Sequence, residues 1–123
     1  MIYIDDIIYA HELLIKSTGG INGVRDMGLL ESAVASPFAS YDGFMPYPTV
    51  KEQAGRLCYG IIKNHPFIDG NKRVGIMVMI TFLEAHGIML NCLNDDLVQL
   101  GLSVTDGTFD EKDILEFIIN HKI

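Results

Sequence analysis

The 123-residue sequence predicts an all-α fold, a helical bundle of about six helices around a buried central helix. In several segments the apolar residues recur at the three- and four-residue spacing of an amphipathic helix. Residues that typically begin or end helices bound these segments, and alternating strand patterns are almost absent. With 49% apolar and 20% charged residues, the chain can bury a sizeable core. We therefore expect a single domain over residues 1–123.

Two helices are expected in the first third of the chain. The first covers residues 5–17, with Asp5 placed to cap its start and the Gly-Gly pair at 19–20 placed to end it in a left-handed conformation. After the turn-rich "INGVRD", the second helix begins near Asp26 and stops at Pro37.

Residues 37–48 predict an irregular loop, because they contain three of the four prolines, a glycine and four aromatic residues. Exposed aromatic residues on a loop are typical of binding groups carried by a fixed scaffold. The alternative is a lid that packs Phe38 and Phe44 inward. The sequence leaves both readings open, and with them the question of whether the loop closes over a substrate.

The third helix begins at a capping-box pattern, in which the Thr49 side chain bonds the Glu52 amide and Glu52 reaches back. It ends near Asn64, because His65 precedes a proline and is pushed away from helical angles. Its buried face is expected to contain Val50, Ala54, Leu57, Cys58, Ile61 and Ile62.

The remaining chain predicts three more helices. The fourth runs from about Asn71 to Gly87 and is apolar nearly all round, which is typical of a central, buried helix. A brief extended link follows it. The fifth is capped by Asn94, and the sixth begins near Asp110.

Composition restricts the possible partners and compartment. The net charge is −7, while residues 63–73 hold three bases and one acid, net +2, so the remainder carries −9. A small anionic ligand suits this pattern better than nucleic acid or an anionic membrane, which require a clustered positive field. Cys58 and Cys92 lie among apolar residues and are expected to be buried, reduced thiols. No signal-peptide pattern or 20-residue apolar span is visible, so we expect a cytoplasmic protein.

The sequence "HPFIDGNKRVG" places an anion-binding pattern at the start of the fourth helix. The first amides of a helix have no internal partner and carry a partial positive charge. Gly70 lets a ligand approach the backbone, and Asn71 adds a neutral donor. Lys72 and Arg73 place two cations where the helix dipole disfavours them, a cost that a bound phosphate would offset.

Two further side chains turn this pattern into a candidate reaction site. His65 can accept a proton from a hydroxyl near neutral pH, and Asp69 can hold Mg²⁺ against phosphate oxygens. Each residue alone fits a turn or a surface position, but together within eleven residues they favour phosphoryl or nucleotidyl transfer. A P-loop, a structural zinc site and a DNA-reading helix are excluded by spacing or charge. His11, His86 and His121 are scattered and expected to be satisfied core or surface residues.

The motif "HPFIDGNKR" resembles the signature of the Fic/Doc family, and "GGINGVRDMGLLESAV" and the loop ending "YPT" resemble its death-on-curing (Doc-like) branch. The resemblance implies an all-α enzyme that uses a nucleotide to modify a protein hydroxyl. Carried over by position, His65 would be the general base, Asp69 would engage Mg²⁺, and Phe67 would anchor the loop in the core. Lys63, outside the motif, would be an outer phosphate contact. The nucleotide phosphates would be held by Gly70, Asn71, Lys72 and Arg73.

The same resemblance suggests which group is transferred. Adenylylating members usually have Gly at the position of Lys72 and a second Arg at that of Ile76, whereas the Doc-like branch has the Lys, lacks that Arg and transfers the terminal phosphate of ATP. Gly70 is typical of the adenylylating branch, so adenylyl (AMP) transfer is the nearer alternative. A non-catalytic nucleotide-binding or interaction module is an alternative of another class.

The Doc-like reading also implies partners. It predicts a toxin of a toxin–antitoxin pair whose target is elongation factor Tu, so that translation is arrested. Some Fic proteins carry an inhibitory helix with Ser or Thr, three residues, then Glu-Gly or Glu-Asn. Here the nearest candidate, Thr49, has Gln53 four residues on, so inhibition would need a separate antitoxin.

Overall fold

The computed structural model describes residues 2–123 and confirms the all-α prediction over that range. Within it the chain forms six α-helices and one turn of 3₁₀-helix, with isolated bridges but no strand. The elements are α1 (Ile4–Thr18), α2 (Met27–Ala35), η1 (Ser36–Phe38), α3 (Val50–Asn64), α4 (Asn71–Ala85), α5 (Asn94–Thr105) and α6 (Glu111–His121).

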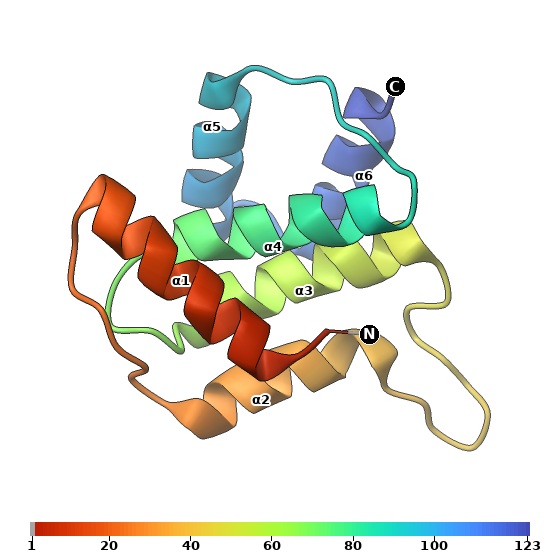
Figure 1. Ribbon diagram of the computed structural model, residues 1–123. Coiled ribbons are helices and arrows are strands. Elements are labelled where there is room, and N and C mark those ends of the chain that lie inside the picture. The colour runs from red at the N-terminus through yellow and green to blue at the C-terminus, as the bar shows by residue number, and fades with distance from the viewer. Residues whose placement is uncertain (1) are drawn as a thin grey trace.

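The centre of the bundle is the antiparallel pair α3 and α4, which lie side by side in Figure 1. α1 packs against α4, α2 against α3, and α5 and α6 cover the other side of the pair. α4 is less enclosed than its apolar sequence suggested. It buries Val78, Met79 and Leu83, but Ile76, Met77 and Ile80 are only half-buried and line a groove shared with α1 and α5. The buried centre is therefore the α3–α4 pair.

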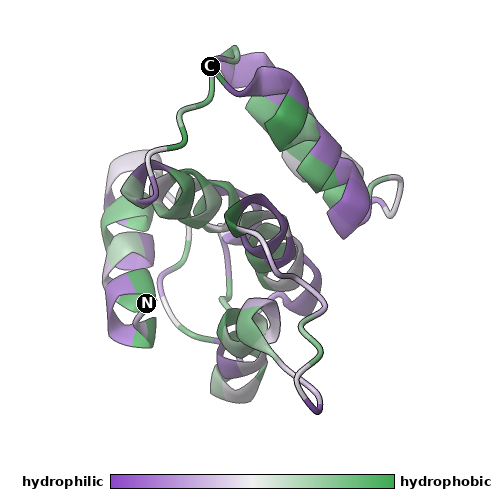
Figure 2. Ribbon diagram, turned by 90° about the vertical axis from the view of Figure 1, so that its right-hand side faces the viewer, coloured by the Kyte–Doolittle hydropathy of each residue, from purple (hydrophilic) through white to green (hydrophobic). Residues whose placement is uncertain are grey.

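Hydrophobic burial explains why these helices associate. Each helix has both hydrophobic and hydrophilic residues along its length, as expected of amphipathic helices (Figure 2). Side chains from α2 to α6 meet in one core with fully buried members from every one of these helices. They include Leu30, Leu57, Ile61, Met79, Leu83, Leu100, Val104, Ile114 and Ile118.

The start of α1 differs from the prediction. The helix begins at Ile4 after an extended Tyr3, and no side chain caps it, so Asp5 is not the cap. Asp5 is the second residue of the helix, within its first turn, where the helix dipole stabilises a carboxylate. At the other end the Gly19 amide donates to the Ile15 carbonyl at 2.8 Å. Gly19 has a positive φ of 86° but an extended ψ of 168°, so the helix ends without a left-handed helical residue.

The predicted caps of α2, α3 and α6 are confirmed. Asp26 accepts from the Leu29 amide at 3.0 Å, and Asp110 accepts from two amides of the first turn of α6. Thr49 accepts from the Glu52 amide at 3.2 Å and donates its hydroxyl to the Glu52 carboxylate at 2.8 Å. Glu52 thus reaches the Thr49 hydroxyl, not the Thr49 amide as in a full capping box.

Two expectations for side chains in α3 and α5 were wrong. Val50 is only half-buried, because it lies at the exposed first position of α3. Asn94 is the first helical residue of α5 rather than its cap. Leu93 precedes it, and the Leu93 amide donates to the Asp96 carboxylate at 3.0 Å. The capping position thus belongs to Leu93, and the carboxylate of Asp96, the third residue of the helix, binds the Leu93 amide.

The loop over residues 37–48 begins in η1 and leads to the first residue of α3. Phe44 is 66% exposed, so the inward-packed lid is wrong for that residue, while Phe38 makes an edge contact with Phe82 at a centroid distance of 6.0 Å. The 15 residues of α3, about 22 Å at 1.5 Å per residue, separate this loop from His65. In this structure the loop therefore lies at the end of α3 opposite His65 (Figure 1).

Both cysteines have free thiols, but only one is fully buried. Cys58 is 0% exposed within α3, whereas Cys92 is half-buried in the link before α5. Within residues 2–123, no helix combines the length and the apolar character needed to cross a bilayer.

Candidate active site

The loop between α3 and α4 lies at one end of the central pair, beside the chain that joins α1 to α2 (Figure 1). α3 ends at Asn64, as predicted, and His65 follows with φ 52° and ψ 54°. The proline that follows His65 predicted that this residue leaves the angles of α3, and it does so by adopting a left-handed conformation that non-glycine residues rarely adopt. The turn ends the helix abruptly and leaves the imidazole exposed at the rim of a cleft.

A buried aromatic residue and a buried amide fix the loop below this rim. Phe67 is 0% exposed and stacks on His11 of α1, with ring centroids 3.9 Å apart. The Asn71 side chain accepts from the Phe67 amide and donates to the Phe67 carbonyl, both at 3.0 Å. Asn71 was expected to offer its side chain as a donor to an anion. That side chain instead holds the loop, which leaves the backbone amide of Asn71 for a ligand.

The cleft at the N-terminus of α4 has a volume of about 170 Å³. Most of the residues singled out in the sequence line it, together with Ile62 and Thr105; Phe67 lies beneath it, and Lys63 is outside the lining. Its lining is Ile62, His65, Asp69, Gly70, Asn71, Lys72, Arg73 and Thr105.

Gly70 is required here by conformation and by space. It is the N-cap of α4, with φ 77° and ψ 17°, in the left-handed region that glycine adopts without strain. A Cβ at this position would lie 3.1 Å from the Ile15 side chain and 3.5 Å from the His11 ring. The glycine therefore lets α1 pack closely under the first turn of α4.

The Asp69 carboxylate lies directly over this helix terminus. One oxygen accepts from the Gly70 amide at 2.8 Å, and the other accepts from the Ile21 amide at 3.2 Å. The bond from the Ile21 amide, followed by that from the Gly70 amide and by a smaller effect of the Arg73 guanidinium 4.0 Å away, lowers the pKa of Asp69 below its ordinary value. Asp69 is therefore an ionised carboxylate at neutral pH, available to a cation.

The basic residues of the motif differ in their surroundings. Arg73 donates to the Thr18 hydroxyl and to the Gly19 carbonyl, which ties the first turn of α4 to the end of α1. Lys72 is exposed, with its aliphatic stem beside Gly101 of α5. Lys63 is exposed outside the cleft, where its charge helps to lower the pKa of Asp106 after the stronger effect of hydrogen bonds from Thr108.

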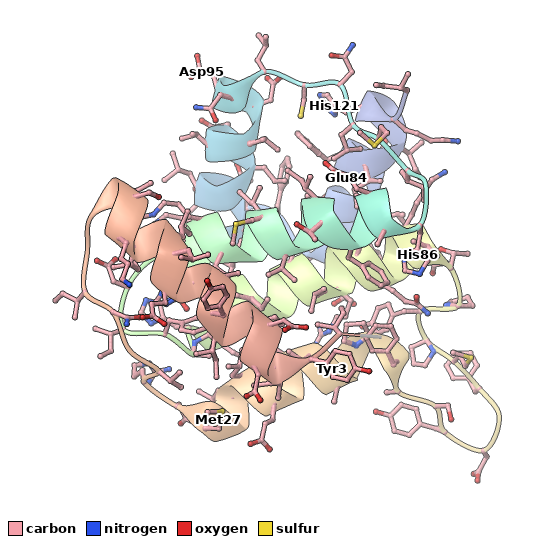
Figure 3. The ribbon with its side chains drawn as sticks, in the orientation of Figure 1. Tyr3, Met27, Glu84, His86, Asp95 and His121 are labelled. Carbon is pink, nitrogen blue, oxygen red and sulfur yellow. The ribbon has the colours of Figure 1, made fainter. Side chains whose placement is uncertain are left out.

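Sequence reasoning did not anticipate what the core histidine holds. His11 is a satisfied core histidine, as expected, but its Nε2–H donates to the Asp69 carbonyl at 2.6 Å and so holds the loop directly. No periodic pattern reveals a pairing between residues 58 positions apart. His86 and His121 each bond the carbonyl four residues earlier and lie on the side of the molecule away from the cleft (Figure 3).

Arg25 and Thr105 were also missed. Arg25 donates from its side chain to carbonyl oxygens at the end of α3, and Thr105 lines the cleft from the last turn of α5. Thr105 comes from a segment without a motif. Arg25 lies in the segment "GGINGVRDMGLLESAV", whose resemblance to the Doc-like branch assigned it no role, so only the folded structure brings both residues to the site.

Together these features define an all-helical protein with a candidate anion-binding site between a histidine and the N-terminus of a central helix. Residues 2–83, well over half of the chain, match the model of the Fic/DOC family, and the chain belongs to that family. It is also similar to the protein named Toxin Doc of Mycolicibacterium smegmatis, with 42% identity over 72 residues. The match covers 58% of this chain and 55% of that protein, so the chain spans about half the length of that relative.

Proposed function

We propose that this protein is a toxin that transfers the terminal phosphate of ATP to a hydroxyl of a target protein, with elongation factor Tu as the target and arrest of translation as the outcome. The observation that carries the proposal is the cleft itself. It brings the exposed His65 imidazole, the ionised Asp69 carboxylate and the N-terminus of α4 to the same 170 Å³ space. Positioning and charge neutralisation are the main requirements of phosphoryl transfer.

In this proposal each residue has one task. The amides of the first turn of α4, with Lys72 and Arg73, bind the phosphates. Arg73 would exchange its bonds to Thr18 and Gly19 for bonds to phosphate oxygens. His65 accepts the proton of the target hydroxyl, whose oxygen forms a bond to the terminal phosphorus as the bond from that phosphorus to the bridging oxygen of ADP breaks.

The site fits a magnesium ion that arrives with the nucleotide. Mg²⁺ is usually held by one or two carboxylates together with phosphate oxygens and waters, and Asp69 offers one half-exposed, ionised carboxylate. No cluster of three or more His, Cys, Asp or Glu residues suited to a metal occurs in the described chain. When bound at Asp69, the ion would neutralise charge on the phosphates.

The similarity to Toxin Doc supports a toxin with a separate antitoxin protein acting in trans. Lys72 supports transfer of the terminal phosphate, because adenylylating relatives usually have Gly there. Gly70 favours the second candidate, adenylyl transfer, since that residue is typical of the adenylylating branch. The third candidate is a nucleotide-binding module without catalysis, which the exposed and accessible His65 makes less favourable.

One assay separates the three candidates. The protein is supplied with purified elongation factor Tu or with cell extract, and with ATP labelled at either the terminal or the innermost phosphate. Terminal label on a protein is the expected result. Innermost label would assign adenylyl transfer. ATP binding without label on any protein would assign the non-catalytic module. Growth arrest on expression, relieved by a co-expressed antitoxin, tests the toxin proposal in cells.

A further inference from the structure

The C-terminal end of α3 is held by an arginine from a distant segment. Arg25 lies in the chain between α1 and α2, 40 residues before His65. Its Nε donates to the His65 carbonyl at 2.7 Å, and one terminal nitrogen donates to the Asn64 carbonyl at 3.0 Å. The carbonyls of the last helical turn lack internal partners and carry partial negative charge. A guanidinium there satisfies both the hydrogen bonds and the charge.

Backbone pairing places Arg25 beside these carbonyls. Its own amide donates to the Pro66 carbonyl at 2.7 Å, and the Ile68 amide donates to the Gly23 carbonyl at 3.0 Å. A bridge between Val24 and Phe67 lies between these bonds. Side chain and backbone of Arg25 together therefore contact three successive carbonyls, those of residues 64, 65 and 66. A single residue thus spans the point at which α3 ends and the motif begins.

The residue that it holds is in an unfavourable conformation. His65 adopts φ 52° without being glycine, and such residues persist only when the surrounding structure holds them in place. The direction of the imidazole follows from this backbone conformation, because Cβ is fixed to it. We propose that Arg25 is a positioning residue for the transfer reaction, which keeps His65 in the left-handed conformation and its imidazole at the rim of the cleft. This inference rests on the proposed function of His65 as the base.

The geometry requires arginine and not just a positive charge. A planar guanidinium carries donors in a fixed fork, so it bonds two neighbouring carbonyls at once, whereas the lysine ammonium is a single point on a flexible stem. Arg25→Lys therefore keeps the charge but cannot donate to the carbonyls of residues 64 and 65 at the same time. The backbone bonds of position 25 to Pro66 remain in that variant, so the variant changes the side-chain contacts alone.

The test compares Arg25→Lys and Arg25→Ala with Arg56→Lys. Arg56 lies in the first half of the same helix, where it bonds Ser36 and Glu111, about 14 Å of helix before His65 at 1.5 Å per residue. We expect Arg25→Lys to lower kcat for label transfer by about 100-fold, the order of loss caused by a misplaced catalytic group, with the Kd for ATP unchanged within about threefold. Arg56→Lys is expected to lower Tm without lowering kcat. A wild-type kcat in Arg25→Lys would overturn the inference.

A second readout is independent of turnover. The three-bond coupling between the amide and α protons of His65, measured by NMR, reports its φ angle in wild type and in Arg25→Lys. A changed coupling, with the couplings of α4 unchanged, supports the positioning role, and an unchanged coupling overturns it. If the wild-type protein transfers no label to any target, the proposed function fails, and this coupling still decides whether Arg25 holds His65.

Discussion

The buried amide of Asn71 gives the strongest prediction about stability. Its side chain is 5% exposed and forms both hydrogen bonds of the Phe67 backbone, at 3.0 Å each. Asn71→Ala would leave the Phe67 amide and carbonyl without partners beside a fully buried ring. Each buried, unpaired backbone group costs about 1–3 kcal/mol, so we expect the free energy of unfolding to fall by about 3 kcal/mol in total. At an m value of about 2 kcal/mol/M, the urea midpoint would fall by about 1.5 M.

Asn94 supplies a matched control for this measurement. Both asparagines are the first residue of a helix, but Asn94 is exposed, and its side chain forms no hydrogen bond to another of the described residues. Asn94→Ala should therefore change the free energy of unfolding by less than about 0.5 kcal/mol. Asn71→Asp should also lower the free energy of unfolding, because it keeps the acceptor for the Phe67 amide but places a carboxylate oxygen against the Phe67 carbonyl oxygen, where the two acceptors repel each other.

Equilibrium unfolding in urea, followed by circular dichroism, tests all three variants under the same conditions. If Asn71→Ala lay within about 0.5 kcal/mol of Asn94→Ala, the Asn71 bonds to Phe67 would contribute nothing. The contacts of the loop with His11 and its backbone bonds to Gly23 and Arg25 would then have to hold the loop.

Three further predictions concern other parts of the molecule. Burial raises the pKa of Cys58 to about 12 from about 8.5 in an unfolded chain. Because the native state holds this proton more tightly, the free energy of unfolding should fall as pH rises through this window. Measured by urea unfolding, the fall should be smaller in Cys58→Ala than in wild type. Thr49→Ala removes the cap of α3 and should lower the free energy of unfolding by about 1 kcal/mol, while Thr49→Ser retains most of it. Phe44→Ser, at a 66% exposed position, should leave ATP affinity by calorimetry unchanged, and a large loss would place the 37–48 loop at the site.

The sequence was sufficient for the helices because their ends are encoded locally. Asp26, Thr49 and Asp110 each bond an amide of the helix that they begin, and short-range rules identify such residues. Asp5 and Asn94 also looked like caps, but neighbouring residues took that position. A run of polar residues near a helix start does not by itself determine which residue lies outside the helix.

The residues that line the site are also close together in the sequence, whereas the contacts that position them come from distant segments. Six cleft-lining residues lie within nine positions of one another, so a single motif identified them. The contacts that fix their positions come from His11, Ile21 and Arg25, which meet the motif only through tertiary packing. The burial of the Asn71 side chain and the left-handed conformation of His65 depend on the same packing, and no sequence pattern predicted either of them.

The central claim is that His65 performs the transfer while the N-terminus of α4 holds the nucleotide. The most direct test measures the Kd for ATP and the rate of label transfer in wild type, His65→Ala and Lys72→Ala. We predict that His65→Ala lowers transfer by at least about 100-fold with little change in Kd, and that Lys72→Ala weakens ATP binding. Transfer at the wild-type rate by His65→Ala would contradict it.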